Sequence, residues 1–143
     1  MGQEAYLFKV KFNDKTLITK VESFLLENEF TKVKPSFYEM KKKEGILELE
    51  LRMEKDFSPG FYLRFAVINP DSVLIMCNDF FSTLKRKFKV EIYDMENKNS
   101  INEIGTDVGE KLSEKRKQFP KLKLIPIRAG KEAIDYIRST ISR

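Results

Sequence analysis

The feature that most constrains the fold is a pair of alternating stretches joined by a short polar segment. Apolar residues occupy the odd positions from 47 to 53, and charged residues occupy the even positions between them. The odd positions from 61 to 67 are again apolar, with Tyr62 and Arg64 between them. The intervening segment ends in Ser58–Gly60, whose sequence Ser-Pro-Gly is typical of a turn. Alternation on both sides of a turn predicts a hairpin over Gly45–Ile68, with one apolar face and one polar face.

The chain before the hairpin predicts one strand and one helix. Ala5–Phe12 alternates, with its larger apolar residues at the even positions, which predicts a strand. Asn13 and Asp14 offer side-chain oxygens that can cap the N-terminus of a helix. Apolar residues then recur at helical spacing, so we expect an amphipathic helix from these residues to about Asn28.

A second strand is predicted over Lys32–Lys42, although its alternation is poor. Pro35 interrupts this segment and cannot donate a hydrogen bond to a neighbouring strand. The segment is therefore expected at a sheet edge or at a bulge. The lysine-rich stretch from 41 to 45 then predicts a polar turn that leads into the hairpin.

A second helix is expected after the hairpin. The sequence Asn69-Pro70-Asp71 ends the second strand, and proline is favoured in the first turn of a helix. The apolar stripe of this helix consists of Val73, Met76, Cys77, Phe80, Leu84 and Phe88. We interpret Cys77 as a small core residue rather than a reactive thiol, because it lies within this stripe.

The remaining chain predicts a strand and two helices. Lys89–Met95 is expected to be a short strand. Ser100–Glu103 matches a capping box, so a helix is expected from there to about Phe119. Leu122–Ile127 is expected to be an irregular or edge segment. A last helix is predicted from the helical spacing of Ile134, Ile137 and Ile141.

The predicted elements follow the order β-α-β-β-β-α-β with two C-terminal helices. Strands grouped in runs favour the α+β class with a mainly antiparallel sheet. The apolar faces of the two long helices need a sheet to cover. We therefore expect a two-layer, ferredoxin-like sandwich with helices on one face of the sheet. Because no repeat or linker divides the sequence, we expect residues 1–143 to form a single domain.

The composition favours a cytoplasmic protein without a membrane partner. No apolar run approaches the roughly 20 residues that a membrane-spanning helix needs. Met1–Tyr6 lacks the basic and apolar regions of a signal peptide, and also the Ser or Thr of a myristoylation motif. Cys77 is the only cysteine, so no intrachain disulfide can form, which suits a reducing compartment.

The absence of histidine excludes most familiar catalytic and metal-binding arrangements. The chain has no histidine and one cysteine. It therefore lacks the usual general base near neutral pH, a Ser-His or Cys-His pair, and the ligands of a zinc site. Arg128–Lys131 contains a Gly-Lys pair but lacks the other residues of a phosphate-binding loop. We expect no catalytic residue, no metal and no cofactor, and hence no enzymatic activity.

Three glutamates on the polar side of the hairpin offer an enzymatic alternative. Glu48, Glu50 and Glu54 could supply an acid–base pair or hold a hard cation. Arg52 and Arg64 are interleaved with them, which favours cross-strand ion pairs on a solvated face instead.

The leading interpretation is a non-enzymatic module that binds another protein. The polar side of the hairpin faces away from the core and offers a flat surface to a partner. A small intracellular inhibitor or immunity-type protein would need no more than such a surface. The candidate protein-binding residues are Glu48, Glu50, Arg52, Tyr62 and Arg64.

The alternative is a nucleic-acid-binding accessory protein. Residues 81–143 hold 15 Lys and Arg against 9 Asp and Glu, whereas residues 1–80 hold 12 against 13. Such uneven charge can mark a surface for nucleic acid, although no helix-turn-helix, RNP or GXXG signature accompanies it. The candidate nucleic-acid contacts are Lys85, Arg86, Lys87, Lys111, Lys115, Arg116 and Lys117. Nothing in the pattern indicates an oligomeric state.

Overall fold

The predicted hairpin is present in the computed structural model of the protein, which describes residues 5–118. Strands β4 (Gly45–Leu51) and β5 (Phe57–Ala66) pair antiparallel, with Glu48 opposite Arg64. The apolar side chains at odd positions from 47 to 51 and from 61 to 65 are buried on one face. The period-two pattern therefore determines which side chains of the hairpin enter the core.

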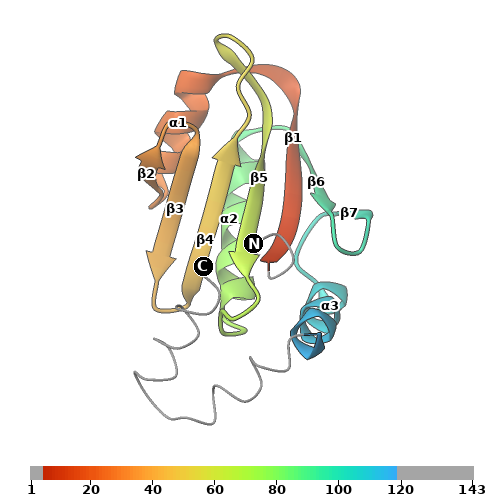
Figure 1. The fold of residues 1–143 in the computed structure, drawn as a ribbon. Coiled ribbons are helices and arrows are strands. Elements are labelled where there is room, and N and C mark those ends of the chain that lie inside the picture. The colour runs from red at the N-terminus through yellow and green to blue at the C-terminus, as the bar shows by residue number, and fades with distance from the viewer. Residues whose placement is uncertain (1–4, 119–143) are drawn as a thin grey trace.

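Five further strands join this hairpin in one antiparallel sheet, shown in Figure 1. They are β1 (Ala5–Leu17), β2 (Thr31–Lys34), β3 (Phe37–Lys42), β6 (Val90–Asp94) and β7 (Asn99–Ile101). The helices of the described residues are α1 (Ile18–Glu27), α2 (Val73–Lys87) and α3 (Thr106–Lys117). The strand order is β2-β3-β4-β5-β1-β6-β7. The α+β class and the antiparallel sheet are confirmed.

The ferredoxin-like order is not confirmed. Within residues 5–118 the elements follow the order β-α-β-β-β-β-α-β-β-α. Two strands, β2 and β3, form where one was expected, and β7 extends the sheet beyond β6. The sheet is therefore wider at both edges than the predicted arrangement.

The expected strand over Lys32–Lys42 is two strands joined by a tight turn. Pro35 and Ser36 form this turn, and Ser36 adopts a left-handed backbone conformation with φ 67°. The pairing between β2 and β3 shifts register between Lys32 and Lys34. The edge position and irregularity expected from the proline are confirmed, since β2 is the outermost strand on its side of the sheet.

Strand β1 continues to Leu17, so the predicted start of the first helix at Asn13 and Asp14 is wrong. After a register shift, β1 pairs with β5 again at Thr16 and Leu17. The backbone N–H of Asn13 donates to the carbonyl of Lys89, 2.9 Å away. Long-range pairing satisfies the backbone here, and α1 starts later without a side-chain cap.

The turn of the hairpin lies earlier in the chain than predicted. Ser58–Gly60 belongs to β5 rather than to the turn. The chain reverses at Lys55, whose φ is 57°, and Glu54 forms a bridge with Phe57. The Ser-Pro-Gly sequence therefore predicted the hairpin correctly but not the position of its turn.

The capping box predicted over Ser100–Glu103 is not used. Ser100 lies in β7, where it pairs with Tyr93 of β6. Helix α3 starts only at Thr106. Its N-cap residue is Gly105, so no side chain caps the helix. Pairing with β6 supplies hydrogen-bond partners for the backbone of Ser100 and Ile101, so the helix is shorter than predicted.

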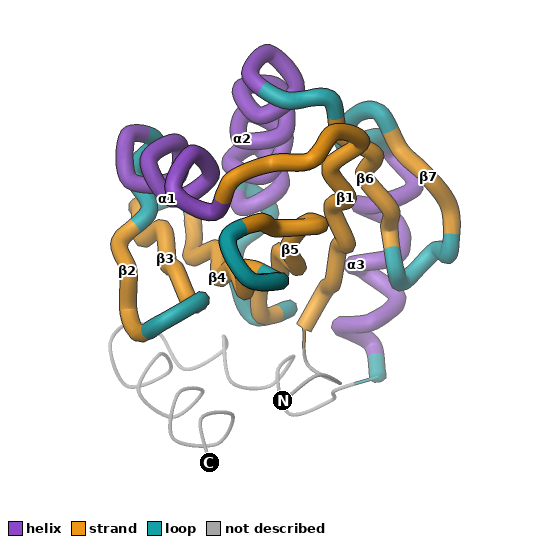
Figure 2. The backbone as a smooth tube through the Cα atoms, turned by 90° about the horizontal axis from the view of Figure 1, so that it is seen from above, coloured by secondary structure: helices purple, strands orange, loops and turns teal. Residues whose placement is uncertain are grey.

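One apolar core lies between the sheet and the helices α1 and α2, which Figure 2 shows on the same face of the sheet. All six residues of the predicted α2 stripe are buried, including Cys77. Aromatic rings fill much of the space: Phe8 meets Phe81 edge-on with ring centroids 5.3 Å apart. The two-layer arrangement with these helices on one face is confirmed.

Several sequence expectations lie outside the described residues. These are the end of the third helix near Phe119, the extended segment Leu122–Ile127, the Gly-Lys pair in Arg128–Lys131, and the last helix over Ile134, Ile137 and Ile141. Within residues 5–118, no helix is long and apolar enough to cross a membrane.

Candidate functional site

The face of the sheet opposite α1 and α2 carries the polar side of the hairpin. Within residues 5–118, no helix crosses the middle of this face (Figures 1 and 2). We call the outward side chains of the central strands the open face. It consists of Leu7, Lys9, Phe37, Glu39, Glu48, Glu50, Tyr62, Arg64 and Tyr93.

The strand register arranges aromatic and charged side chains of the open face in one row. Phe37 lies opposite Glu50, which lies opposite Tyr62. Lys9 lies opposite both Tyr62 and Tyr93. Neighbouring strands are about 4.8 Å apart, so aromatic residues on alternate strands are about 10 Å apart. The row therefore alternates an apolar ring with a charge from β3 to β6.

A second row contains an ion pair. Glu39 lies opposite Glu48, Glu48 opposite Arg64, and Arg64 opposite Leu7. The Arg64 Nη2 atom is 3.3 Å from Glu48 Oε2, and the two side chains are 40% and 43% exposed. Such a solvated pair contributes little to stability. Its groups remain accessible to a partner.

A shallow hollow of about 450 Å³ lies on this face. It is lined by Leu7, Phe37, Glu48, Leu49, Glu50, Tyr62, Arg64 and Met95. Four of the five predicted protein-binding residues therefore line one hollow. The fifth, Arg52, is not among the lining residues and follows the end of β4, where its backbone N–H donates to the carbonyl of Gly60 at 3.0 Å.

Sequence reasoning missed the apolar part of this hollow. Leu7 comes from β1, Phe37 from β3, and Met95 follows β6. Alternation alone could have assigned Phe37 to this face, because its neighbour Tyr38 is a core residue. Strand order was needed as well, since only it brings β1 and β3 to either side of the hairpin.

The edges of the sheet are poorly suited to adding a strand from a partner. β2 is four residues long, contains Lys32 and Lys34, and is followed by Pro35. β7, at the other edge, is three residues long. Short strands, lysines and proline are the features by which proteins block pairing at an exposed edge.

The predicted nucleic-acid contacts lie on two helices, α2 and α3. Lys85, Arg86 and Lys87 end α2 near the top of Figure 1, whereas Lys111 and Lys117 lie on α3 at its lower right. Lys85 donates to the carbonyl of Asn102, and Arg86 donates to the hydroxyl of Thr83.

Two of these candidate residues, Lys115 and Arg116, connect α3 to the rest of the protein through hydrogen bonds and an ion pair. Lys115 Nζ lies 2.7 Å from a Glu96 carboxylate oxygen, and both side chains are mostly buried. Arg116 donates to the carbonyls of Val67 and Asn69, at 2.9 and 2.5 Å. These contacts occupy both side chains within the fold.

Asp94 is a fully buried carboxylate that sequence reasoning did not single out. It accepts hydrogen bonds from the Tyr6 hydroxyl at 2.7 Å and from the backbone N–H groups of Glu96 and Asn97 at 2.9 and 3.0 Å. Burial, and then the bond to Asp94, raise the pKa of Tyr6. Tyr6 is therefore a neutral donor, and this group of residues orders the loop after β6.

A second polar contact joins the edge of the sheet to α1. Glu22 accepts hydrogen bonds from the Tyr38 hydroxyl at 2.5 Å and from Lys32 at 2.9 Å. These two bonds lower the pKa of Glu22, while burial raises the pKa of Tyr38.

Burial also raises the pKa of the Cys77 thiol, which agrees with its interpretation as a core residue.

Of the three glutamates of the enzymatic alternative, Glu48 and Glu50 line the hollow of the open face together, whereas Glu54 does not. Glu48 is paired with Arg64, and Glu54 lies in the hairpin turn rather than in the hollow of the open face. Within residues 5–118, no three side chains of His, Cys, Asp or Glu are placed to hold one metal ion.

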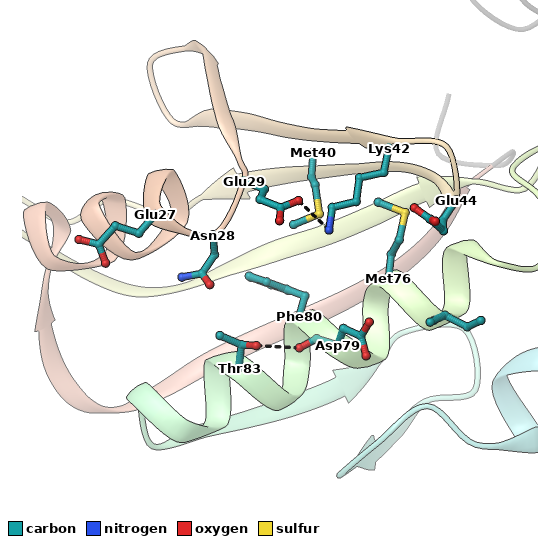
Figure 3. A pocket seen from close by; sticks show the side chains of 11 residues that line it. Glu27, Asn28, Glu29, Met40, Lys42, Glu44, Met76, Asp79, Phe80 and Thr83 are labelled. Carbon is teal, nitrogen blue, oxygen red and sulfur yellow. Dashed lines mark hydrogen bonds and ion pairs between the residues drawn. The ribbon is translucent and has the colours of Figure 1, made fainter.

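Figure 3 shows a different hollow, of about 350 Å³, between the end of α1, β3 and α2. Its floor includes Met40, Met76 and Phe80. Its rim carries carboxylates, and Lys42 pairs with Glu29 across it at 2.6 Å. These carboxylates would attract a cation, but the other lining side chains do not indicate which ligand would bind.

In comparisons with known proteins, the chain matches no protein-family model and no curated protein.

Proposed function

We propose that this protein is a non-enzymatic binding module that docks another protein on the open face of its sheet. The observation that carries the proposal is the hollow in which Phe37, Tyr62 and Arg64 come together with the apolar side chains of Leu7 and Met95. We place the protein among small inhibitors or immunity-type proteins of the cytoplasm, which act by covering a partner's surface.

The residue types of the hollow support this proposal. Tyrosine and arginine are enriched among the residues that dominate binding energy, and aromatic residues and methionine are enriched across protein interfaces. Tyr62 presents a ring and Arg64 a guanidinium group beside apolar neighbours. A partner with an apolar anchor could fill the hollow and displace water from it.

The charges around the hollow support selectivity. Glu48 and Arg64 already form an ion pair, and Glu50 is exposed in the adjacent row. A partner must present charges that match this pattern, because an unmatched charge loses its hydration without compensation.

The proposal is tested by capturing partners from native cells with the wild-type protein and with a variant carrying Tyr62→Ala and Arg64→Ala. The matched control carries Glu110→Ala and Lys117→Ala, which lie exposed on α3. A partner identified by mass spectrometry is then purified, and its Kd for each variant is measured by calorimetry.

We expect the open-face variant to bind at least about tenfold more weakly than wild type, because truncating a dominant interface residue costs about 2 kcal/mol or more and tenfold corresponds to about 1.4 kcal/mol. The control should bind as wild type does. A partner that tolerates the open-face substitutions, or the lack of any stoichiometric partner, would contradict the proposal.

A further inference from the structure

A separate hollow lies at the end of the molecule where β1 leads into α1 and α2 leads into β6. Its volume is about 350 Å³. Four lysines line it, two from each of two segments that are distant in the sequence. We call it the lysine hollow, and its lining is Asp14, Lys15, Thr16, Leu17, Lys20, Lys87, Phe88 and Lys89.

The fold holds the two lysine-bearing segments together. The backbone N–H of Asn13 donates to the carbonyl of Lys89 at 2.9 Å. The register of β1 against β5 shifts between Lys11 and Thr16, next to this hollow. Lys20 Nζ lies 5.6 Å from the ring centroid of Phe88, which is nearly fully buried and fixed in the core.

The four lysines are exposed and have no carboxylate within ion-pair distance among residues 5–118. By contrast, Lys32, Lys42 and Lys115 each pair with a glutamate. Asp14 is the one acidic side chain in the lining. Lys15 Nζ lies 4.2 Å from the centroid of the Phe57 ring, which is outside the lining. The like charges around the hollow repel one another, and a bound anion would relieve this repulsion.

The backbone adds to the positive potential on one side of the hollow. Helix α1 begins there with no side-chain cap and no acidic residue in its first turn. The N–H of Ile18 already donates to the carbonyl of Asp56 at 2.9 Å, but the next N–H groups of the first turn favour an anion. The C-terminus of α2 opposes this effect, but Lys85, Arg86 and Lys87 in its last turn offset the partial negative charge.

We propose that the lysine hollow binds the phosphate backbone of a nucleic-acid strand, in a way that does not depend on base sequence. Lysine is a strong but geometrically unselective phosphate binder. The lining offers no exposed aromatic ring for stacking, because Phe88 is buried. Contacts of this kind position a strand without reading its bases. The site is independent of the open face, and Lys87 is its only member among the nucleic-acid contacts predicted from the sequence.

The test measures fluorescence anisotropy of a labelled single-stranded oligonucleotide over a range of salt concentrations. Four phosphate contacts on a single strand give a slope of log K against log salt of about −2.8, a loss of roughly fiftyfold between about 50 and about 200 mM salt. Removing two contacts with Lys20→Gln and Lys89→Gln should reduce the slope to about −1.4 and weaken binding at low salt.

The matched control carries Lys111→Gln and Lys117→Gln on α3, which removes the same charge elsewhere. We expect it to keep the wild-type slope. The variant with Tyr62→Ala and Arg64→Ala should also keep the wild-type slope. This result is expected whether or not the open face binds a protein. Circular dichroism confirms that each variant is folded.

Three results would overturn the proposal. The first is no oligonucleotide binding at low salt, and the second is an equal change of slope in the control. The third is lysine-dependent binding of inorganic tripolyphosphate without binding of the oligonucleotide, which would make the hollow a site for a small polyphosphate instead.

Discussion

At the scale of single residues, Asp94 shows how one buried carboxylate organises its surroundings. Its oxygens accept bonds from Tyr6, from two backbone N–H groups, and from the Asn97 side chain at 3.2 Å. Strand pairing brings these groups together, because Phe8 of β1 lies opposite Asp94 of β6. Each donor compensates part of the cost of removing the charge from water.

We predict that Tyr6→Phe lowers the free energy of unfolding by about 1–3 kcal/mol, because Asp94 loses a buried donor. Urea unfolding monitored by circular dichroism measures this change. Tyr93→Phe is the control, since Tyr93 is 38% exposed on the open face. Equal changes in the free energy of unfolding for the two substitutions would show that the hydrogen bond to Asp94 does not stabilise the protein.

The lowered pKa of Glu22 predicts that part of the folding stability is lost in acid. Its pKa is lowered in the folded protein by the hydrogen bonds from Tyr38 and Lys32. The stabilisation is therefore present above the pKa of the unfolded state, about 4.3, and disappears as the pH falls through the folded value. Glu22→Gln should reduce the difference in melting temperature between pH 7 and pH 3. Glu110→Gln, at an exposed site on α3, should leave that difference unchanged.

At the scale of secondary-structure elements, two glycines with opposite roles can be compared. Gly60 lies in β5 with φ 154°, and a Cβ atom added there would lie 1.9 Å from the carbonyl oxygen of Val10. Gly109 lies within α3, where an added Cβ would be 3.9 Å from Leu74 Cδ1. The first glycine permits close approach of two strands, whereas the second only weakens its helix.

We predict that Gly60→Ala destabilises the protein by at least about 2 kcal/mol, since β1 and β5 must separate to admit the methyl group. Gly109→Ala should stabilise it by about 0.5–1 kcal/mol through helix propensity. Thermal and urea unfolding of both variants test the pair. A neutral Gly60→Ala would contradict the close approach of the two strands.

Elements also show where local sequence signals compete with long-range pairing. Asn13 and Asp14 resemble helix caps, and Ser100–Glu103 resembles a capping box. In the structure, however, Asn13 donates to the Lys89 carbonyl, and Ser100 pairs with Tyr93 in the sheet. A cap contributes about 1 kcal/mol. Several ladder hydrogen bonds together with burial of neighbouring side chains outweigh it.

At the scale of the whole molecule, the open face and the lysine hollow are built differently. The open face depends on the register of β3, β4, β5 and β1, which aligns side chains across the sheet. The lysine hollow depends on the meeting of two connections at one end of the sheet. Substitutions at exposed positions of one should not alter binding at the other, because distant sites without shared partners act additively.

Local patterns in the sequence predicted the hairpin, the strand at the N-terminal end of the chain and helix α2, together with the faces that these elements turn to the core. Alternation predicted the hairpin, and helical spacing predicted five of the six buried residues of α2, but not Phe81. The sequence also identified four of the side chains that line the hollow of the open face. These inferences depend on the local periods of strands and helices, which a sequence displays directly.

The strand order, the additional strands β2 and β7, and the neighbours of each surface residue depend instead on the folded structure. It placed Leu7 and Phe37 beside Tyr62 and Arg64, and it brought Lys20 to Lys89. The physical reason is that these neighbours are set by hydrogen-bond ladders between residues far apart in the chain. Such pairings leave no periodic signal in the sequence, whereas the faces of each element do.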